Sequence, residues 1–191
     1  SSAASDVYKR QTIRLQANMT EGTVGQTNVN GYVSLGHKDL DLRIEGENTP
    51  LGFLNHYISD IFHNIRGRST GTCRIFGGFK SIDFEGSQRA SASALLPING
   101  VTYHLNDAEV EISPGTFRLN SATLTDSLRG TGRVQGVLNH RHLHDMRYDF
   151  AMSGNNMLLY DRPQEDDLPF YATAYGTGDV LLKGRPGRLD V

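Results

Sequence analysis

The chain has 191 residues, with 19 Lys and Arg against 21 Asp and Glu, and its formal net charge at pH 7 is −2. This balance excludes the strongly basic surface of a nucleic-acid-binding domain and the polybasic patch of a membrane-surface binder. Cys73 is the only cysteine, so an intramolecular disulfide framework and a thiolate zinc site are also excluded. No run of about 18 apolar residues predicts a membrane-spanning helix.

Residues 1–11 are interpreted as foreign to the natural protein. The segment Asp6-Val-Tyr-Lys-Arg-Gln11 resembles a translated transposon end of the kind used to prepare sequencing libraries. We therefore expect residues 1–11 to be a disordered sequencing artefact that plays no part in the fold. The sequence also stops at Asp190-Val191, in the middle of an alternating pattern. Residues 12–191 are accordingly expected to be part of a single elongated domain that is truncated at both ends.

From residue 12 onward, apolar and polar residues alternate with a period of two, first at Ile13, Leu15, Ala17 and Met19. Alternation of this kind places the apolar side chains on one face of a sheet and the polar ones on the other. A solvated second face favours a long antiparallel or mixed sheet, so the predicted fold class is mostly β. Later alternating segments supply the main apolar face, which consists of Leu42, Ile44, Ile82, Phe84, Tyr103, Leu105, Val110, Ile112, Phe117, Leu119, Tyr148, Phe150, Val180 and Leu182.

One segment departs from this period and predicts a short amphipathic helix over residues 50–66. Thr49 is suited to the N-cap, Pro50 to the first helical position and Gly67 to the position after the last turn. Apolar residues recur there at intervals of three and four, and the expected helix face is Leu54, Ile58, Ile61 and Phe62. This face is expected to lie against the sheet, either as a plug or partner-docking element or as a lid that completes the core.

Asn99-Gly100 separates two alternating runs and predicts a hairpin, because Gly and Asn tolerate a positive φ angle.

Residues with catalytic or metal-binding chemistry are few. His140, His142 and His144 would share one face if they lay in a strand, where three imidazoles could meet a metal; the alternative is a solvated turn. The acidic run at residues 165–167 lacks the pattern of a calcium loop, and no serine lies in a nucleophile elbow. We therefore expect no enzyme activity, no resident metal and no cofactor.

From about Pro50 onward, the order of several short segments resembles the C-terminal region of the TamB family, in the AsmA-like superfamily. The segments include Pro50-Leu-Gly-Phe-Leu-Asn-His-Tyr-Ile and Gly71-Thr-Cys-Arg-Ile-Phe-Gly77. Further matches are Val101-Thr-Tyr-His-Leu105 with Phe117-Arg-Leu119, then Leu124-Thr-Asp126. The most specific match is Pro169-Phe-Tyr-Ala-Thr-Ala-Tyr-Gly-Thr-Gly178, in which Ala172 replaces the usual glycine.

This resemblance implies a fold, a location and a function. The family's sheet is folded lengthwise into a U, called a β-taco, with an apolar groove inside and a polar surface outside. The implied protein lies in the periplasm, is anchored in the inner membrane through a segment outside this sequence, and bridges the inner and outer membranes. It would carry phospholipid acyl chains along the groove, support outer-membrane protein assembly with a TamA-type barrel partner, or do both. The main apolar face would then line the groove.

Two other interpretations stay open. Strand addition to an exposed edge of the sheet would serve assembly through backbone hydrogen bonds rather than through an apolar trough. A secreted or surface adhesin fragment, built as a β-sandwich or β-helix with no transport role, would instead have a closed apolar interior.

Overall fold

The computed structural model describes residues 12–21, 25–56, 59, 62–128, 130–162, 172–185 and 188–190. These residues form eleven strands in one sheet, in which each strand is paired with its neighbours along the chain. The strands are β1 (Thr12–Glu21), β2 (Gly25–Ser34), β3 (Asp39–Pro50), β4 (His63–Gly78), β5 (Ser81–Leu96), β6 (Val101–Ser113), β7 (Thr116–Asp126), β8 (Thr131–Arg141), β9 (His144–Arg162), β10 (Ala172–Arg185) and β11 (Arg188–Asp190).

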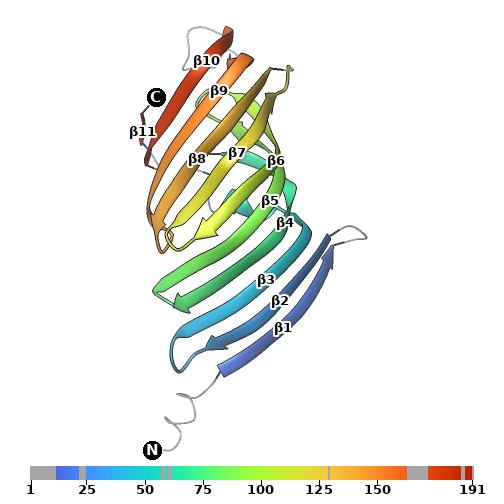
Figure 1. Ribbon diagram of the computed structural model, residues 1–191, viewed down its shortest axis with the longest axis vertical. Helices are drawn as coiled ribbons and strands as arrows, with labels where there is room; N and C mark the ends of the chain where they lie inside the picture. The colour runs from blue at the N-terminus through green and yellow to red at the C-terminus, as the bar shows by residue number, and fades with distance from the viewer. Residues whose placement is uncertain are drawn as a thin grey trace, which may run out of the picture.

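The sheet is an antiparallel meander, which confirms the mostly-β class. In Figure 1 it runs as a twisted ladder from β1 at the bottom to β10 and β11 at the top. Short turns between alternating segments produce this order, because a tight turn can join only neighbouring antiparallel strands. The Asn99-Gly100 hairpin is confirmed: the N–H groups of both residues donate to the carbonyl of Leu96, and Gly100 has a φ of +74°.

The helix predicted over residues 50–66 is wrong. Pro50 ends β3, residues Gly52–His56 form a single 3₁₀ helix (η1), and residues from His63 onward belong to β4. Of the expected helix face, Leu54 lies in η1 and Phe62 precedes β4, whereas Ile58 and Ile61 fall outside the described residues.

Strand pairing overrides the helical periodicity in this segment. The start of β4 pairs with β5, with Gly67 opposite Ala92, and the N–H of Leu51 donates to the carbonyl of Gly67. The side chain of Asn55 links η1 to β4. It accepts from the N–H of Ile65 at 2.8 Å and donates to the carbonyl of Ile65 at 2.9 Å. The backbone of residues 63–67 therefore has hydrogen-bond partners on both sides, in β5 and in the segment at residues 51–55.

The strand register places the whole predicted apolar face on one side of the sheet. Residues directly opposite in an antiparallel pair share a face. Ile44 lies opposite Cys73 of β4 and Val29 of β2, and the same succession of pairs continues through β10. This common apolar face contains Leu42, Ile44, Ile82, Phe84, Tyr103, Leu105, Val110, Ile112, Phe117, Leu119, Tyr148, Phe150, Val180 and Leu182.

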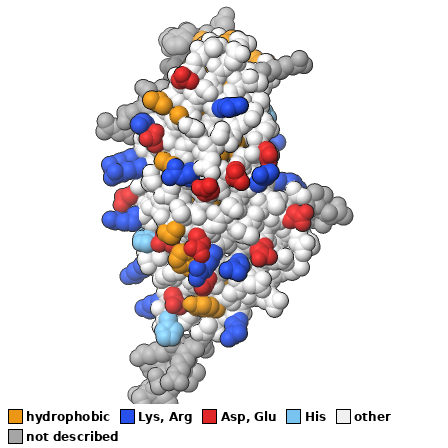
Figure 2. Space-filling view, viewed as in Figure 1, with side chains coloured by type: hydrophobic (Ala, Val, Ile, Leu, Met, Phe, Trp, Pro, Cys, Tyr) orange, Lys and Arg blue, Asp and Glu red, His pale blue; other side chains and the backbone are white. Residues whose placement is uncertain are grey.

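The opposite face is charged. Figure 2 shows a side of the molecule on which acidic and basic side chains are interspersed and hydrophobic ones are few. Arg74 is the best-connected of these charges: it forms ion pairs with Asp41 at 2.7 Å and with Glu85 at 2.8 Å, and its guanidinium lies over the ring of Phe76. The hydrogen bond from Arg74 lowers the pKa of Asp41, so both stay charged at neutral pH.

Three bulges share one design, in which an Asn or Asp residue with a positive φ angle donates its N–H to a hydroxyl of the facing strand. The pairs are Asn48 with Thr70 (3.0 Å), Asp107 with Ser91 (3.0 Å) and Asn156 with Thr177 (2.9 Å). A bulge bends its strand and increases the local twist. The three bulges lie in β3, β6 and β9, and we attribute part of the curl of the sheet to them.

Candidate functional site

The common apolar face is uncovered over the first part of the sheet. On β1, the exposed fractions of Ile13, Leu15 and Met19 are 49%, 39% and 54%. Leu42 and Ile44 on β3 are only partly buried. Isolated exposed apolar residues are ordinary, but a contiguous apolar patch marks a binding surface. Strands β1–β3 therefore present an open part of the apolar face, whereas Phe84 on β5 already packs against Phe117.

The same face is closed further along, over β6–β9. Its buried cluster consists of Ala108, Ala122, Leu124, Val134 and Met157, with exposed fractions between 0% and 8%. The predicted groove residues Tyr103, Leu105, Leu119 and Phe150 pack against this cluster. Here the sheet is curled tightly enough to form its own small core, against which these four partly buried side chains pack.

Asp126 holds one side of this curl together. The residue is 6% exposed, and its carboxylate accepts from the N–H groups of Leu128 (2.8 Å), Gly130 (2.8 Å) and, across the curl, Leu158 (2.6 Å). Burial raises the pKa of this carboxyl, but the backbone donors outweigh burial and hold the pKa below its ordinary value. Asp126 therefore acts as a charged clamp between the β7–β8 turn and β9.

Tyr103 also joins two distant strands of the curl, β6 and β9. Its hydroxyl donates to the carbonyl of Leu158 at 2.9 Å, although β6 and β9 are three strand positions apart in the sheet. In a flat sheet that separation is about 14 Å. The Asn99 amide also donates to the carbonyl of Leu159, and Figure 1 shows the end of the β5–β6 hairpin passing behind β7–β9.

An aromatic cluster closes the other side of the curl. The ring centroids of Phe117 and His140 are 4.9 Å apart, and those of Phe84 and His140 are 6.1 Å apart. Phe84 lies on β5 and His140 on β8, so the curl again brings together side chains from strands three positions apart. His142, in the following turn, lies 3.6 Å from the carboxylate of Asp83 on β5.

The three histidines do not converge on a metal. His140 is buried in the aromatic cluster, His142 lies in the turn, and His144 is exposed. The positive φ angles of His142 and Leu143 break the strand at this point, so the alternation rule does not apply across it. Within the described ranges, no group of three His, Cys, Asp or Glu side chains is placed to hold a metal ion.

We expect the stability of the curl to depend on the protonation of His140. Its Nδ1 atom accepts from the N–H of Leu143 at 3.1 Å. Burial lowers the pKa of its imidazole; Asp83 opposes this shift and His142 adds to it. Protonation would place a charge between two phenyl rings. The unfolded chain binds this proton near pH 6.5 and the folded chain only at lower pH, so the free energy of unfolding should decrease as the pH falls through this range.

Denaturation at a series of pH values from 7.5 to 5 tests this expectation, with His140→Phe as the control. The variant keeps an aromatic ring and should show a shallower dependence on pH than the wild type. Equal slopes for the two proteins would show that other groups produce the dependence.

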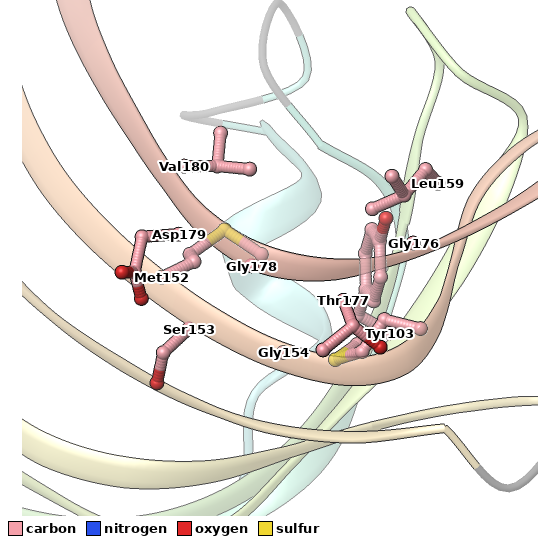
Figure 3. Close-up of a pocket in the computed structure, with 11 residues that line it drawn as sticks. Tyr103, Met152, Ser153, Gly154, Leu159, Gly176, Thr177, Gly178, Asp179 and Val180 are labelled. Atoms are coloured by element: carbon pink, nitrogen blue, oxygen red, sulfur yellow. The ribbon is translucent and has the colours of Figure 1, made fainter.

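A small pocket lies beside the closed part of the sheet (Figure 3). Its volume is about 190 Å³, and Tyr103, Met152, Met157, Leu159 and Val180 are among its lining residues. Gly154, Gly176 and Gly178 form part of its wall on β9 and β10. The pocket is bounded mainly by apolar side chains and glycine backbone, and its size fits the end of one acyl chain or one small ring.

No protein-family model, no curated protein and no solved structure matches this chain. The resemblance to the TamB family therefore stays a prediction that rests on the order of the sequence segments. Among the residues that the structure describes, no helix is long and apolar enough to cross a membrane.

Proposed function

We propose that this chain is part of a periplasmic groove protein of the TamB type, and that its apolar face carries phospholipid acyl chains between the inner and outer membranes. The observations that support this proposal are the register, which keeps apolar residues on one face from β1 to β10, and the exposure of that face over β1–β3. In this proposal the exposed stretch is one section of a U-shaped groove, and the curled section, which begins with Phe84 on β5, limits the groove.

The hydrophobic effect favours the binding of an acyl chain to the open section. Each methylene removed from water contributes about 0.8 kcal/mol, so a hydrocarbon chain gains from any continuous apolar surface. Three strands spaced about 4.8 Å apart extend this surface over about 10 Å. A groove of this kind requires neither a nucleophile nor a metal. Anchoring in the inner membrane through a segment outside this sequence, and contact with a TamA-type barrel in the outer membrane, are further parts of the proposal.

Ile44 and Arg43 form a matched pair for testing this proposal, because they are adjacent on β3 and lie on opposite faces of the sheet. The full chain is exported to the periplasm of a Gram-negative host, purified without detergent, and analysed by lipid extraction and native mass spectrometry. Wild type and Arg43→Asp should carry phospholipid, whereas Ile44→Asp should retain at least about tenfold less. A tenfold change corresponds to about 1.4 kcal/mol, less than the contribution of two methylenes.

Two outcomes would contradict the lipid proposal: a wild-type chain free of phospholipid, or equal loss in the two variants. Assembly by strand addition predicts a different pattern. An unfolded outer-membrane strand peptide that binds through backbone hydrogen bonds would bind Ile44→Asp and Arg43→Asp about equally.

A further inference from the structure

One row of the common apolar face carries polar side chains and glycines in place of apolar residues over β2–β5. Thr27 on β2 lies opposite Gly46 on β3. Gly71 on β4 lies opposite both Gly46 and Gln88 on β5. Gly46 is two residues after Ile44, so the whole row belongs to the apolar face. Over β6–β10 the same row is apolar or glycine, with Val110, Leu119, Gly136, Phe150 and Leu182.

Polar side chains cover the two glycines of this row. A Cβ atom at Gly71 would lie 3.1 Å from the amide carbon of Gln88, so the Gln88 amide lies over Gly71. The hydroxyl of Thr49 occupies the equivalent space beside Gly46, and it is 3.0 Å from the hydroxyl of Thr27. The missing side chains of the two glycines therefore leave room for one amide and one pair of hydroxyls on the apolar side of the sheet.

These polar groups have hydrogen-bond donors to spare. Among the described residues, none forms a hydrogen bond with the Gln88 amide, and neither polar atom of that amide is fully buried. Whichever threonine donates within the hydroxyl pair, the other keeps a proton that it can donate. Along the described parts of β2–β5, no charged side chain shares this row or the two rows beside it. The spare donors therefore suit an uncharged acceptor, such as a carbonyl oxygen, better than a phosphate.

We propose that this polar row binds the ester carbonyl groups of a diacyl phospholipid whose acyl chains lie on the adjoining apolar rows. The inference rests on the proposed function and adds the position of the ester end. Leu40, Leu42 and Ile44 precede the row on β3, and the row lies about 7 Å beyond Ile44. A diacyl phospholipid carries two neighbouring esters, and the row offers two donor groups, the Gln88 amide and the threonine pair.

The donors would fix the position of the lipid along the strands. An ester carbonyl that lies against an apolar surface loses its hydrogen bonds to water, which costs free energy unless a protein donor replaces them. The apolar rows supply no such donor, whereas the polar row does. The ester end of the lipid should therefore come to rest over Gln88, with the hydrocarbon on the rows of Ile44 and Leu42.

A comparison of ester and ether lipids tests this site. The purified full chain is incubated with excess vesicles that contain equal amounts of a diester phosphatidylcholine and of its diether analogue with the same chain lengths. The chain is then re-isolated, and native mass spectrometry measures the ratio of the two bound lipids. The wild type should be enriched in the diester lipid by about three- to tenfold, because the diether analogue offers no carbonyl to the donors.

Two substitutions of Gln88 remove the amide donor in different ways. Gln88→Leu removes all polar atoms, and Gln88→Glu keeps the size of the side chain but cannot donate at neutral pH. Both should reduce the preference for the diester lipid to less than about twofold. Gln135→Leu is the matched control, because Gln135 is exposed on the charged face of β8, and it should keep the wild-type preference. Circular dichroism checks that all three variants are folded.

The possible outcomes separate the ester site from the proposed function. Equal amounts of the two lipids on the wild type would overturn the ester site and leave the binding of acyl chains in place. A preference that survives in both Gln88 variants would also overturn the ester site. A wild type that takes up neither lipid would contradict the proposed function and the ester site together.

Discussion

Replacing Asp126 with alanine is expected to lower the free energy of unfolding by about 3–5 kcal/mol, because several backbone donors lose their acceptor at once. The N–H groups of Gly130 and Leu158 are buried, and the Asp126 carboxylate accepts from both. Water cannot replace the carboxylate there without opening the contact between the β7–β8 turn and β9. Each buried donor left without a partner costs about 1–3 kcal/mol.

Asp161→Ala is the matched control for this prediction. Asp161 is exposed, and its side chain accepts from the hydroxyl of Thr173, so the same chemical change should alter the free energy of unfolding by less than about 1 kcal/mol. The chain contains no tryptophan, so far-ultraviolet circular dichroism in urea is the appropriate measurement. A loss below about 1 kcal/mol in Asp126→Ala would show that the curl is held mainly by other contacts.

Asp126→Ala should also change the response of the protein to acid. The backbone donors hold the pKa of this carboxyl low in the folded chain, so the unfolded chain takes up the proton first as the pH falls. The wild type should therefore lose stability as the pH falls below about 4, by an amount that is absent from the variant.

The face that carries the apolar side chains was predictable from the sequence, because each side chain of a strand points to one of only two faces. Once β3 begins with apolar residues at Leu40, Leu42 and Ile44, each antiparallel partner must place its own apolar residues on the same side. The order of the strands in the sheet was also predictable, because short turns join neighbouring strands. These two features determine which side of the sheet is apolar, but not where that side is covered.

A U-shaped curl was expected from the family resemblance, but the tight closure over β6–β9 was not predicted, although one signal for a bend is present in the sequence. Tyr103 and Leu105 alternate in one phase, whereas Ala108 and Val110 alternate in the other. Both runs can face the same side only if an extra residue is inserted between them, and the structure places the bulge at Asp107. A change of phase within one strand therefore indicates a bulge, but it does not reveal which distant strand the bend brings into contact.

Asp126 was overlooked for a related reason. Asp126-Ser-Leu-Arg-Gly130 has the composition of an Asx turn, in which the carboxylate accepts from backbone N–H groups shortly after it in the chain. Its third partner, Leu158, is 32 residues away. Local sequence could indicate the turn but not the long-range bond that makes this carboxylate a clamp.

Gly136→Val is expected to lower the free energy of unfolding by about 2–3 kcal/mol, although valine normally favours strands over glycine. A Cβ atom at Gly136 would overlap with Cδ1 of Phe150 and lie 2.5 Å from the carbonyl oxygen of Asp149. Phe150 is directly opposite Gly136 in the β8–β9 pair, and its ring covers the glycine. The ring also packs against the core of the curl, so moving it disturbs more than one contact.

A double-mutant cycle separates this packing effect from backbone strain. In a Phe150→Ala background the valine enters the space that the ring leaves, so the cost of Gly136→Val should fall by at least about 1 kcal/mol. If the cost is instead unchanged in that background, the backbone of β8, and not the ring, rejects the side chain. The predicted coupling would show that the aromatic ring and the glycine opposite it act as one unit. The missing side chain at Gly136 leaves room on the inside of the curl for the Phe150 ring, which a second full side chain would displace.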